Sequence, residues 1–109
     1  MSSETVQMRT SPPTFAYLIV TKGAQAGSIF QLKPDTTTVG RSGTNDIRID
    51  DPNVSGEHLR IRHESGEFTL IDLGSTNGTR VNGRQMHQHV LRHNDRVQIG
   101  DTILLFKKA

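Results

Sequence analysis

Residues 58 to 72 read His58-Leu-Arg-Ile-Arg-His63, then Glu64-Ser-Gly-Glu67, then Phe68-Thr-Leu-Ile-Asp72. Apolar and basic residues alternate in the first part, which is the pattern of a β-strand with one buried face. We therefore expect Leu59 and Ile61 to face a core, with the neighbouring arginines facing water. The Ser-Gly pair is typical of a hairpin turn, so the stretch predicts two antiparallel strands.

The same pattern of short apolar runs and turn residues continues on both sides, with turns about every eight to twelve positions. Val, Ile and Thr make up 27 of the 109 residues and Ala only four, which favours strands over helices. The sequence predicts an all-β sandwich of ten or eleven strands, with Asn82-Gly83 as a second hairpin turn. The other expected strands are 15–20 paired with 28–32, then 36–39, 47–49, 79–81, 89–91, 96–99 and 102–106.

A chain of 109 residues has the length of one domain. We interpret residues 1–13, which end in Pro12-Pro13, as a flexible tail and residues 14–109 as the folded domain. The tail lacks the apolar stretch of a signal peptide, so a cytoplasmic location is expected unless the chain is one domain of a longer protein. The absence of Cys excludes disulfides, Cys-ligated zinc and thiol catalysis.

Charge and aromatic content argue against nucleic acid as a partner. The net charge is only +2, aromatic residues make up 5%, and there is no Trp. Arg60, Arg62, Arg92 and Arg96 could form a basic face, although a solvated sheet face is the commoner explanation. No apolar run approaches the ~18 residues of a membrane span, so no membrane partner is expected.

Catalytic and metal sites find little support. The sequence has no G-x-S-x-G, Walker or G-x-G-x-x-G motif, and we interpret Asp50-Asp51 as a surface turn. His87, His89 and His93 could bind zinc, but no carboxylate or Cys nearby completes the set. We therefore expect no enzyme activity, no cofactor and no metal.

Three loops combine hydrogen-bonding residues with glycine: 40–42, 53–58 and 75–79. Arg41 offers a planar fork of donors, Ser55 a hydroxyl, and Gly56 an accessible N–H. An arginine, a hydroxyl and a backbone N–H together suit a tetrahedral dianion such as phosphate. Ordinary sandwich turns are the alternative reading, because Gly, Asn and Ser are frequent in turns.

The order and spacing of these pieces resemble the forkhead-associated (FHA) domain. The matching pieces are Gly40-Arg41, Ser55-x-x-His58, residues 70–79 and Val81-Asn-Gly83. The resemblance runs from about Tyr17 to Phe106 and is strongest to small bacterial FHA regulators. It implies an eleven-stranded β-sandwich whose loops at one end bind phosphothreonine peptides.

The resemblance also implies roles for individual residues. The residues expected to contact the phosphopeptide are Arg41 and Ser55 at the phosphate, with Gly56, Thr76 and Asn77 around the peptide. Gly40, His58 and Gly78 match positions that support the site, with His58 bracing the loop that carries Ser55.

Three positions depart from the family pattern. Gly56 has no side chain to reach a ligand, and Glu57 is negative where a basic residue is common. If Glu57 pointed at the site, its charge would weaken phosphate binding. Asn53 stands where relatives can be basic, so no strong acidic preference is expected three residues after the phosphothreonine.

The sequence thus predicts a monomeric phosphothreonine-reading module downstream of Ser/Thr kinases, whose candidate partners are a Thr-phosphorylated protein or peptide and a Ser/Thr kinase. The alternative is an FHA fold that binds a partner through a sheet face without phosphate. Thr5 and Thr10 in the tail are candidate phosphorylation sites. Their short tether favours binding to a neighbouring molecule over closure onto the same domain.

Overall fold

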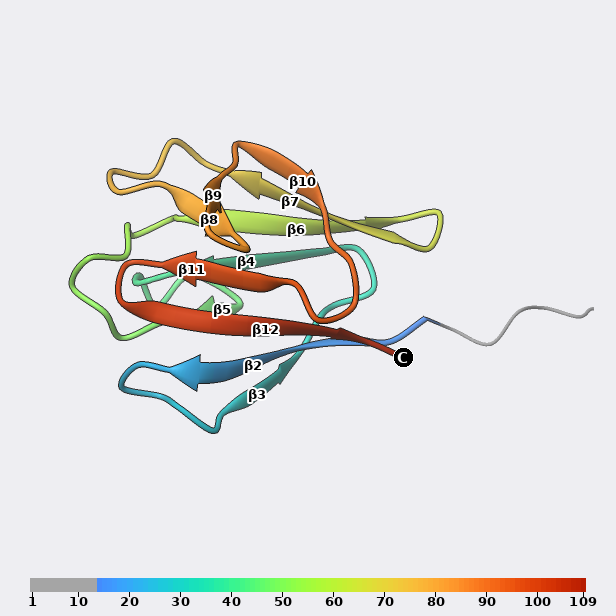
Figure 1. The fold of residues 1–109 in the computed structure, drawn as a ribbon, viewed down its shortest axis with the longest axis horizontal. Coiled ribbons are helices and arrows are strands. Elements are labelled where there is room, and N and C mark those ends of the chain that lie inside the picture. Colours follow the sequence, from blue (N-terminus) through green and yellow to red (C-terminus); the bar gives the residue numbers. More distant parts are fainter. Residues whose placement is uncertain (1–13) are drawn as a thin grey trace, which may run out of the picture.

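The computed structural model describes residues 14–109, which form two packed antiparallel sheets with one short parallel pair (Figure 1). The expectations for residues 1–13, including Thr5 and Thr10, lie outside the described residues. The five-stranded sheet has the order β10-β7-β6-β4-β5, and the six-stranded sheet has the order β3-β2-β12-β11-β8-β9. The strands are β2 (Ala16–Lys22), β3 (Ile29–Gln31), β4 (Thr36–Gly40), β5 (Ile47–Arg48), β6 (Leu59–Glu64), β7 (Glu67–Asp72), β8 (Thr79–Val81), β9 (Arg84–Gln85), β10 (Gln88–Val90), β11 (Arg96–Ile99) and β12 (Thr102–Lys108).

The eleven strands confirm the predicted all-β sandwich. Most boundaries agree with the prediction to within two residues. The sequence analysis missed β9 as a strand, since it is only two residues long and both side chains are exposed. It pairs with β8 across the predicted Asn82-Gly83 turn.

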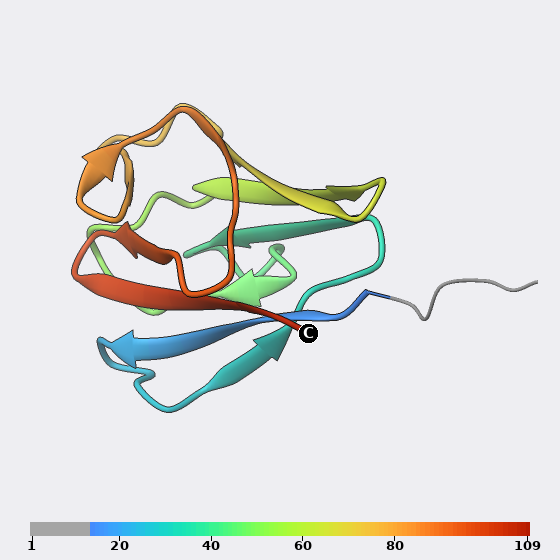
Figure 2. The ribbon, with the colours of Figure 1, turned by 45° about the vertical axis from the view of Figure 1, so that its right-hand side comes forward.

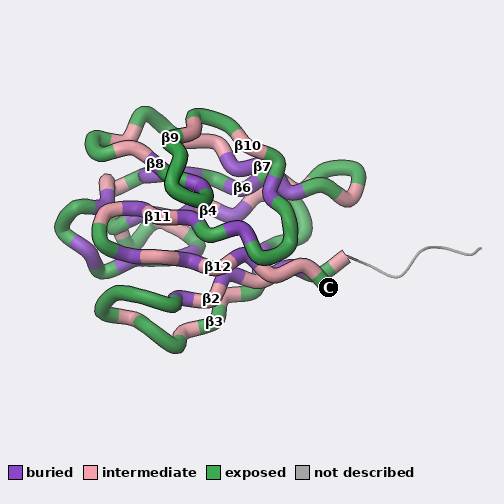
Figure 3. The backbone as a smooth tube through the Cα atoms, viewed as in Figure 1, coloured by how far each residue is buried: buried purple, intermediate pink, exposed green. Residues whose placement is uncertain are grey.

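Alternation along the strands builds the core between the two sheets (Figure 3). Leu59 and Ile61 on β6 are buried while the arginines beside them are exposed, as predicted. Phe68 from β7 packs against Phe106 from β12, with ring centroids 5.6 Å apart. The core therefore joins the two sheets through large side chains from each.

The two predicted hairpin turns adopt left-handed backbone conformations. Ser65 and Gly66 have φ of 51° and 78°, and Asn82 and Gly83 have φ of 52° and 86°. Positive φ at both central residues is the geometry that matches the twist of two-residue hairpins. These turns set the registers Glu64↔Glu67 and Val81↔Arg84.

The loops that follow β4, β5 and β7 gather at one end of the sandwich (Figure 1). The chain enters β2 at the opposite end, and the turned view of Figure 2 shows the same separation. Within residues 14–109, no helix has the length and apolarity that crossing a membrane requires.

Candidate functional site

The loop after β4 and the loop before β6 are joined through their backbones. The Arg41 N–H donates to the Ser55 carbonyl at 2.9 Å, and the Ser42 N–H donates to the Gly56 carbonyl at 3.1 Å. A Cβ on Gly40 would collide with that same Gly56 carbonyl. Glycine at position 40 therefore allows the two loops to approach.

Arg41 is held by one edge of its guanidinium group. Its Nε donates to the Val54 carbonyl at 3.0 Å. Its two terminal nitrogens make no hydrogen bond within residues 14–109, and the residue is exposed. The side chain is thus oriented by the protein while most of its donors face solvent.

Ser55 connects the second loop to the third. Its Oγ accepts from the Thr76 N–H at 3.0 Å. Because that bond uses a lone pair of the oxygen, the hydroxyl proton can donate to a bound anion. Its backbone N–H donates to Nδ1 of His58 at 3.1 Å.

Asn77 completes the cluster from the loop after β7. Its Nδ2 donates to the Asn53 carbonyl at 2.9 Å, which leaves its Oδ1 as an acceptor. An open cavity of about 150 Å³ lies between the three loops. Its lining residues are Arg41, Pro52, Asn53, Val54, Ser55, Thr76 and Asn77. Four of the five residues expected at the phosphopeptide are therefore brought together, whereas Gly56 does not line this cavity.

His58 is fully buried beneath the loops. Its Nδ1 accepts from the Ser55 N–H, so its Nε2 must carry the proton that is donated to the Gly78 carbonyl at 3.0 Å. Burial lowers the pKa of His58, although the Gly78 carbonyl and the nearby Asp72 carboxylate oppose this effect. A neutral imidazole thus links the loop of Ser55 to the loop of Asn77.

Gly78 connects Asn77 to β8 with a φ of 80°. A Cβ at this position would lie 2.8 Å from Nε2 of Gln85. The left-handed backbone therefore favours glycine here, whereas the exposed Gln85 side chain could move aside for a Cβ.

Two supporting residues were missed by the sequence analysis. Nδ2 of Asn45 donates to the Ser42 carbonyl at 2.8 Å and to the Gly56 carbonyl at 2.6 Å, which ties the first two loops together. Asp72 accepts from two backbone N–H groups and from the hydroxyls of Ser75 and Thr79. These hydrogen bonds outweigh burial and lower the pKa of Asp72. The sequence Asp72-Leu-Gly-Ser75, with an Asp two residues before a Gly-Ser pair, was an available signal for this loop, whereas nothing in the sequence singled out Asn45.

The interpretation of Asp50-Asp51 as a surface turn is wrong for Asp51. This side chain is buried and accepts from the Asn53 N–H at 2.9 Å, the Asp101 N–H at 2.8 Å and the Thr102 hydroxyl at 2.8 Å. Burial alone would raise the pKa of Asp51, but the hydrogen bonds from these groups lower it. Asp51 therefore fixes the loop that carries Asn53 to the β11–β12 turn.

Glu57 turns away from the cluster around Arg41. It lines a separate cavity together with Thr38, Thr44, Asn45, Arg60 and Leu73. The two cavities have no lining residue in common. The charge of Glu57 therefore lies on the outer side of the β4–β6 surface, with Arg60 at the same cavity.

The other candidate sites are not assembled. The expectation that no carboxylate lies near the three histidines is wrong, because His89 contacts the Asp95 carboxylate at 3.0 Å; Nδ1 of His93 instead accepts from the Lys108 N–H at 3.0 Å. Residues 14–109 contain no group of three or more His, Asp or Glu that could hold a metal ion. Arg62 lies on the five-stranded sheet and Arg96 on the six-stranded sheet, so the suggested basic face is divided.

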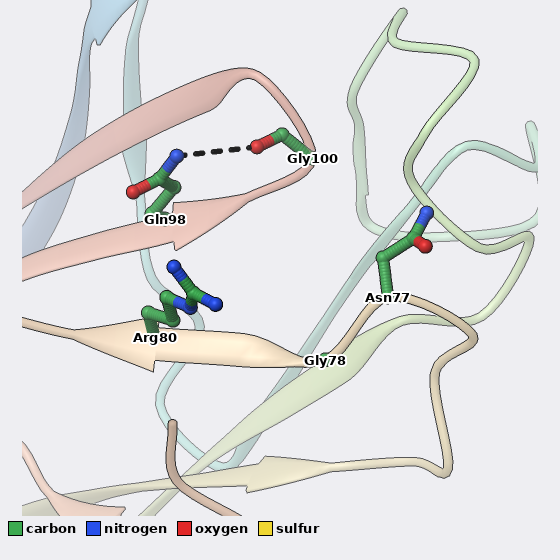
Figure 4. A pocket seen from close by; sticks show the side chains of 5 residues that line it. All are labelled: Asn77, Gly78, Arg80, Gln98 and Gly100. Atoms are coloured by element: carbon green, nitrogen blue, oxygen red, sulfur yellow. Dashed lines mark hydrogen bonds between the residues drawn. The ribbon is translucent and has the colours of Figure 1, made fainter. Parts of the chain in front are cut away.

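A second small cavity adjoins the first at Asn77 (Figure 4). It is lined by Asn77, Gly78, Arg80, Gln98 and Gly100. Figure 4 shows Arg80 on β8 beside Gln98 on β11, with Nε2 of Gln98 donating to the Gly100 carbonyl at 3.4 Å. The surface of the loop cluster thus continues onto the six-stranded sheet.

Comparison with known proteins agrees with this geometry. The FHA domain family model matches residues 37–100. The chain is 45% identical over 95 residues to the glycogen accumulation regulator GarA of Mycolicibacterium smegmatis, covering 87% of this chain and 60% of that protein. It is 43% identical to the oxoglutarate dehydrogenase inhibitor of Corynebacterium efficiens, covering 87% of this chain and 67% of that protein.

A solved FHA domain, studied for phosphothreonine-dependent FHA interactions, superimposes with a TM-score of 0.80 at 30% identity. The match covers 85% of this chain and 95% of that one. The relatives are named as a regulator and an inhibitor rather than as enzymes. The chain spans about 60% of the length of the GarA proteins it matches.

Proposed function

Because this chain belongs to the FHA family, we propose that it binds proteins phosphorylated on threonine, through the loops that carry Arg41, Ser55 and Asn77. The observation that carries the proposal is the shared cavity, where an oriented arginine lies with a serine hydroxyl able to donate, and the terminal nitrogens of that arginine make no hydrogen bond to residues 14–109. A phosphothreonine carries about −1.5 to −2 charges and three acceptor oxygens, which these donors complement.

Each residue has a distinct task in this proposal. The terminal nitrogens of Arg41 and the Ser55 hydroxyl bind the phosphate oxygens. Although Gly56 does not line the cavity, its N–H follows Ser55 directly in the chain and adds a donor in this proposal, while the exposed Thr76 contacts the peptide. Asn77 uses its Oδ1 to accept from a peptide N–H, because its Nδ2 donates to the Asn53 carbonyl.

The names of the relatives suggest the biological setting. GarA is named for glycogen accumulation, and the Corynebacterium relative for inhibition of oxoglutarate dehydrogenase. We propose that this chain likewise regulates a metabolic enzyme in the cytoplasm, under the control of a Ser/Thr kinase. It would act as a monomer that binds one phosphorylated site at a time.

The test starts from a library of peptides with a fixed central phosphothreonine, selected on the immobilised domain. The best peptide and its unphosphorylated twin are then measured by titration calorimetry. We expect binding of the phosphorylated peptide only. Equal affinity of the twins would instead favour the phosphate-independent alternative.

A further inference from the structure

The outer face of the six-stranded sheet has an apolar centre. Side chains that face each other across paired strands lie on the same face of a sheet. The registers place Leu105, Ile19 and Ile29 in one row across β12, β2 and β3. Ile103 and Tyr17 extend this row on either side along β12 and β2. Ile29 is 63% exposed and the other four are half-buried, although the opposite face of the same strands forms the core. We call these five residues the outer apolar patch.

The charged side chains within the strands of this sheet have one sign. The six strands carry six basic residues and no Asp or Glu: Lys22, Arg80, Arg84, Arg96, Lys107 and Lys108. The registers place four of them on the outer face with the patch, at Lys22, Arg80, Arg96 and Lys107, whereas Lys108 donates to the Gly66 carbonyl of the β6–β7 turn at 2.8 Å. The five-stranded sheet carries three basic and three acidic residues: Arg48, Arg60, Arg62, Glu64, Glu67 and Asp72. The chain as a whole has a net charge of only +2. The basic character is therefore concentrated on the sheet that carries the outer apolar patch.

The patch is continuous with the phosphate cavity. Arg96 pairs with Leu105 in the register of β11 and β12, so it stands at the end of the apolar row. On β11, Gln98 lies two residues further along and pairs with Arg80 on β8. Arg80 and Gln98 line the second cavity, which shares Asn77 with the phosphate cavity. A ligand larger than a peptide could therefore contact both surfaces at once.

We propose that the outer apolar patch is a second docking surface for the phosphorylated partner protein, which meets it with an apolar area rimmed by Asp and Glu. Complementary charge around an apolar centre is the composition of a protein interface. A second copy of this chain is a poor occupant, because the basic residues that face outward from the strands of the two copies would repel each other. The identity of the occupant as the phosphorylated partner rests on the proposed function.

The chain offers matched variants for the test. Ile29 on β3 and Val90 on β10 are both exposed and β-branched, and each lies on an edge strand of a different sheet. Arg96 and Arg62 are both exposed arginines within strands of different sheets. Ile29→Glu and Arg96→Glu alter the proposed surface, while Val90→Glu and Arg62→Glu make the same chemical changes elsewhere. Because all four side chains are exposed, we expect these substitutions to leave the fold undisturbed.

Proteins retained by the wild-type domain from lysate of the organism that encodes it are identified by mass spectrometry. The proteins whose retention Ile29→Glu reduces and Val90→Glu does not are then purified in phosphorylated form. Each is titrated against all variants, beside a phosphothreonine peptide taken from its own sequence. We expect Ile29→Glu and Arg96→Glu to weaken binding of the whole protein by about tenfold. The peptide affinity should stay within about twofold, and the two control variants should change neither measurement.

Several results would overturn the proposal. If no retained protein distinguishes Ile29→Glu from Val90→Glu, the patch is not a protein-docking surface. Selective loss of binding to phosphatidylglycerol vesicles in Ile29→Glu, without loss of any protein, would assign the patch to a membrane. A different result would contradict the proposed function alone. A partner that binds Arg41→Ala but not Ile29→Glu would show that it docks on the outer apolar patch and that the Arg41 cavity does not bind its phosphate.

Discussion

Acidification from pH 7.5 to pH 5.5 should destabilise this domain through His58. The folded protein uses Nδ1 of His58 as an acceptor for the Ser55 N–H, and the ring is fully buried. A protonated imidazole has no acceptor, so the Ser55 N–H would face another donor. Burial also lowers the pKa of His58 in the folded state. The unfolded chain, with an ordinary pKa of about 6.5, therefore takes up the proton more readily.

The size of the effect follows from this difference. A group whose folded pKa is depressed gives a stability that falls as pH drops through the unfolded pKa. If His58 stays neutral in the folded state, protonation of the unfolded chain lowers the free energy of unfolding by RT ln(1 + 10^(6.5−pH)). This amounts to about 0.1 kcal/mol at pH 7.5 and about 1.4 kcal/mol at pH 5.5. The expected loss is thus up to about 1.3 kcal/mol. Asp51 and Asp72 have lowered pKa values in the folded protein. Their contribution to stability is lost only as the pH falls toward and below the ordinary carboxyl pKa of about 4.

Urea unfolding at the two pH values measures this loss. We expect the free energy of unfolding of His58→Asn to depend less on pH than that of the wild type, by about 1 kcal/mol. His87→Asn, which alters an exposed histidine, should keep the wild-type dependence. The same pH dependence in His58→Asn and the wild type would refute the reasoning. Should His58→Asn not fold, an NMR titration of the wild type decides, because a His58 resonance titrating at or above its ordinary pKa contradicts the account.

Three further predictions concern the loops. Gly40→Ala should lower the free energy of unfolding by about 1–3 kcal/mol, because its Cβ would collide with the Gly56 carbonyl; Gly43→Ala, with open space around its Cβ, is the control in the same urea assay. Gly56→Arg should bind phosphopeptide up to about tenfold more tightly by calorimetry, since only the Ser42 Cβ at 3.9 Å lies near its Cβ and a new guanidinium could reach phosphate; an unchanged affinity would mean that the side chain points elsewhere. A phosphothreonine peptide should bind about fourfold more tightly than the matched phosphoserine peptide, because one methyl buried beside Pro52 and Val54 contributes about 0.8 kcal/mol; equal affinities would exclude that contact.

Patterning predicted the architecture because long strands such as β2, β6 and β12 bury alternate residues. The alternation around Leu59 and Ile61 determines which side chains enter the core, and the Ser65-Gly66 turn determines the register of the hairpin. The resemblance to the FHA domain, carried by short motifs, also implied that Arg41, Ser55 and Asn77 would lie together, and all three line one cavity. These features depend on local periodicity and on short motifs, which a sequence displays directly.

The parts that sequence reasoning missed depend on contacts between distant segments. Asp51 is buried because the β11–β12 turn, about fifty residues away along the chain, supplies two of its hydrogen-bond donors. Asn45 ties two loops through backbone carbonyls, which carry no sequence signal. The outer apolar patch is visible only after the order β3-β2-β12-β11 is known, because its residues come from three separate strands.

The most direct test of the central claim is the affinity of Arg41→Ala for the selected phosphothreonine peptide, measured by titration calorimetry. Removal of one partner of a charge-assisted, partly desolvated pair costs about 2–5 kcal/mol, so the affinity should fall at least about thirtyfold. Arg62→Ala removes an exposed arginine from the outer surface of β6 and should bind like the wild type. An Arg41→Ala domain that binds the peptide as tightly as the wild type would contradict the assignment of this cavity to phosphate.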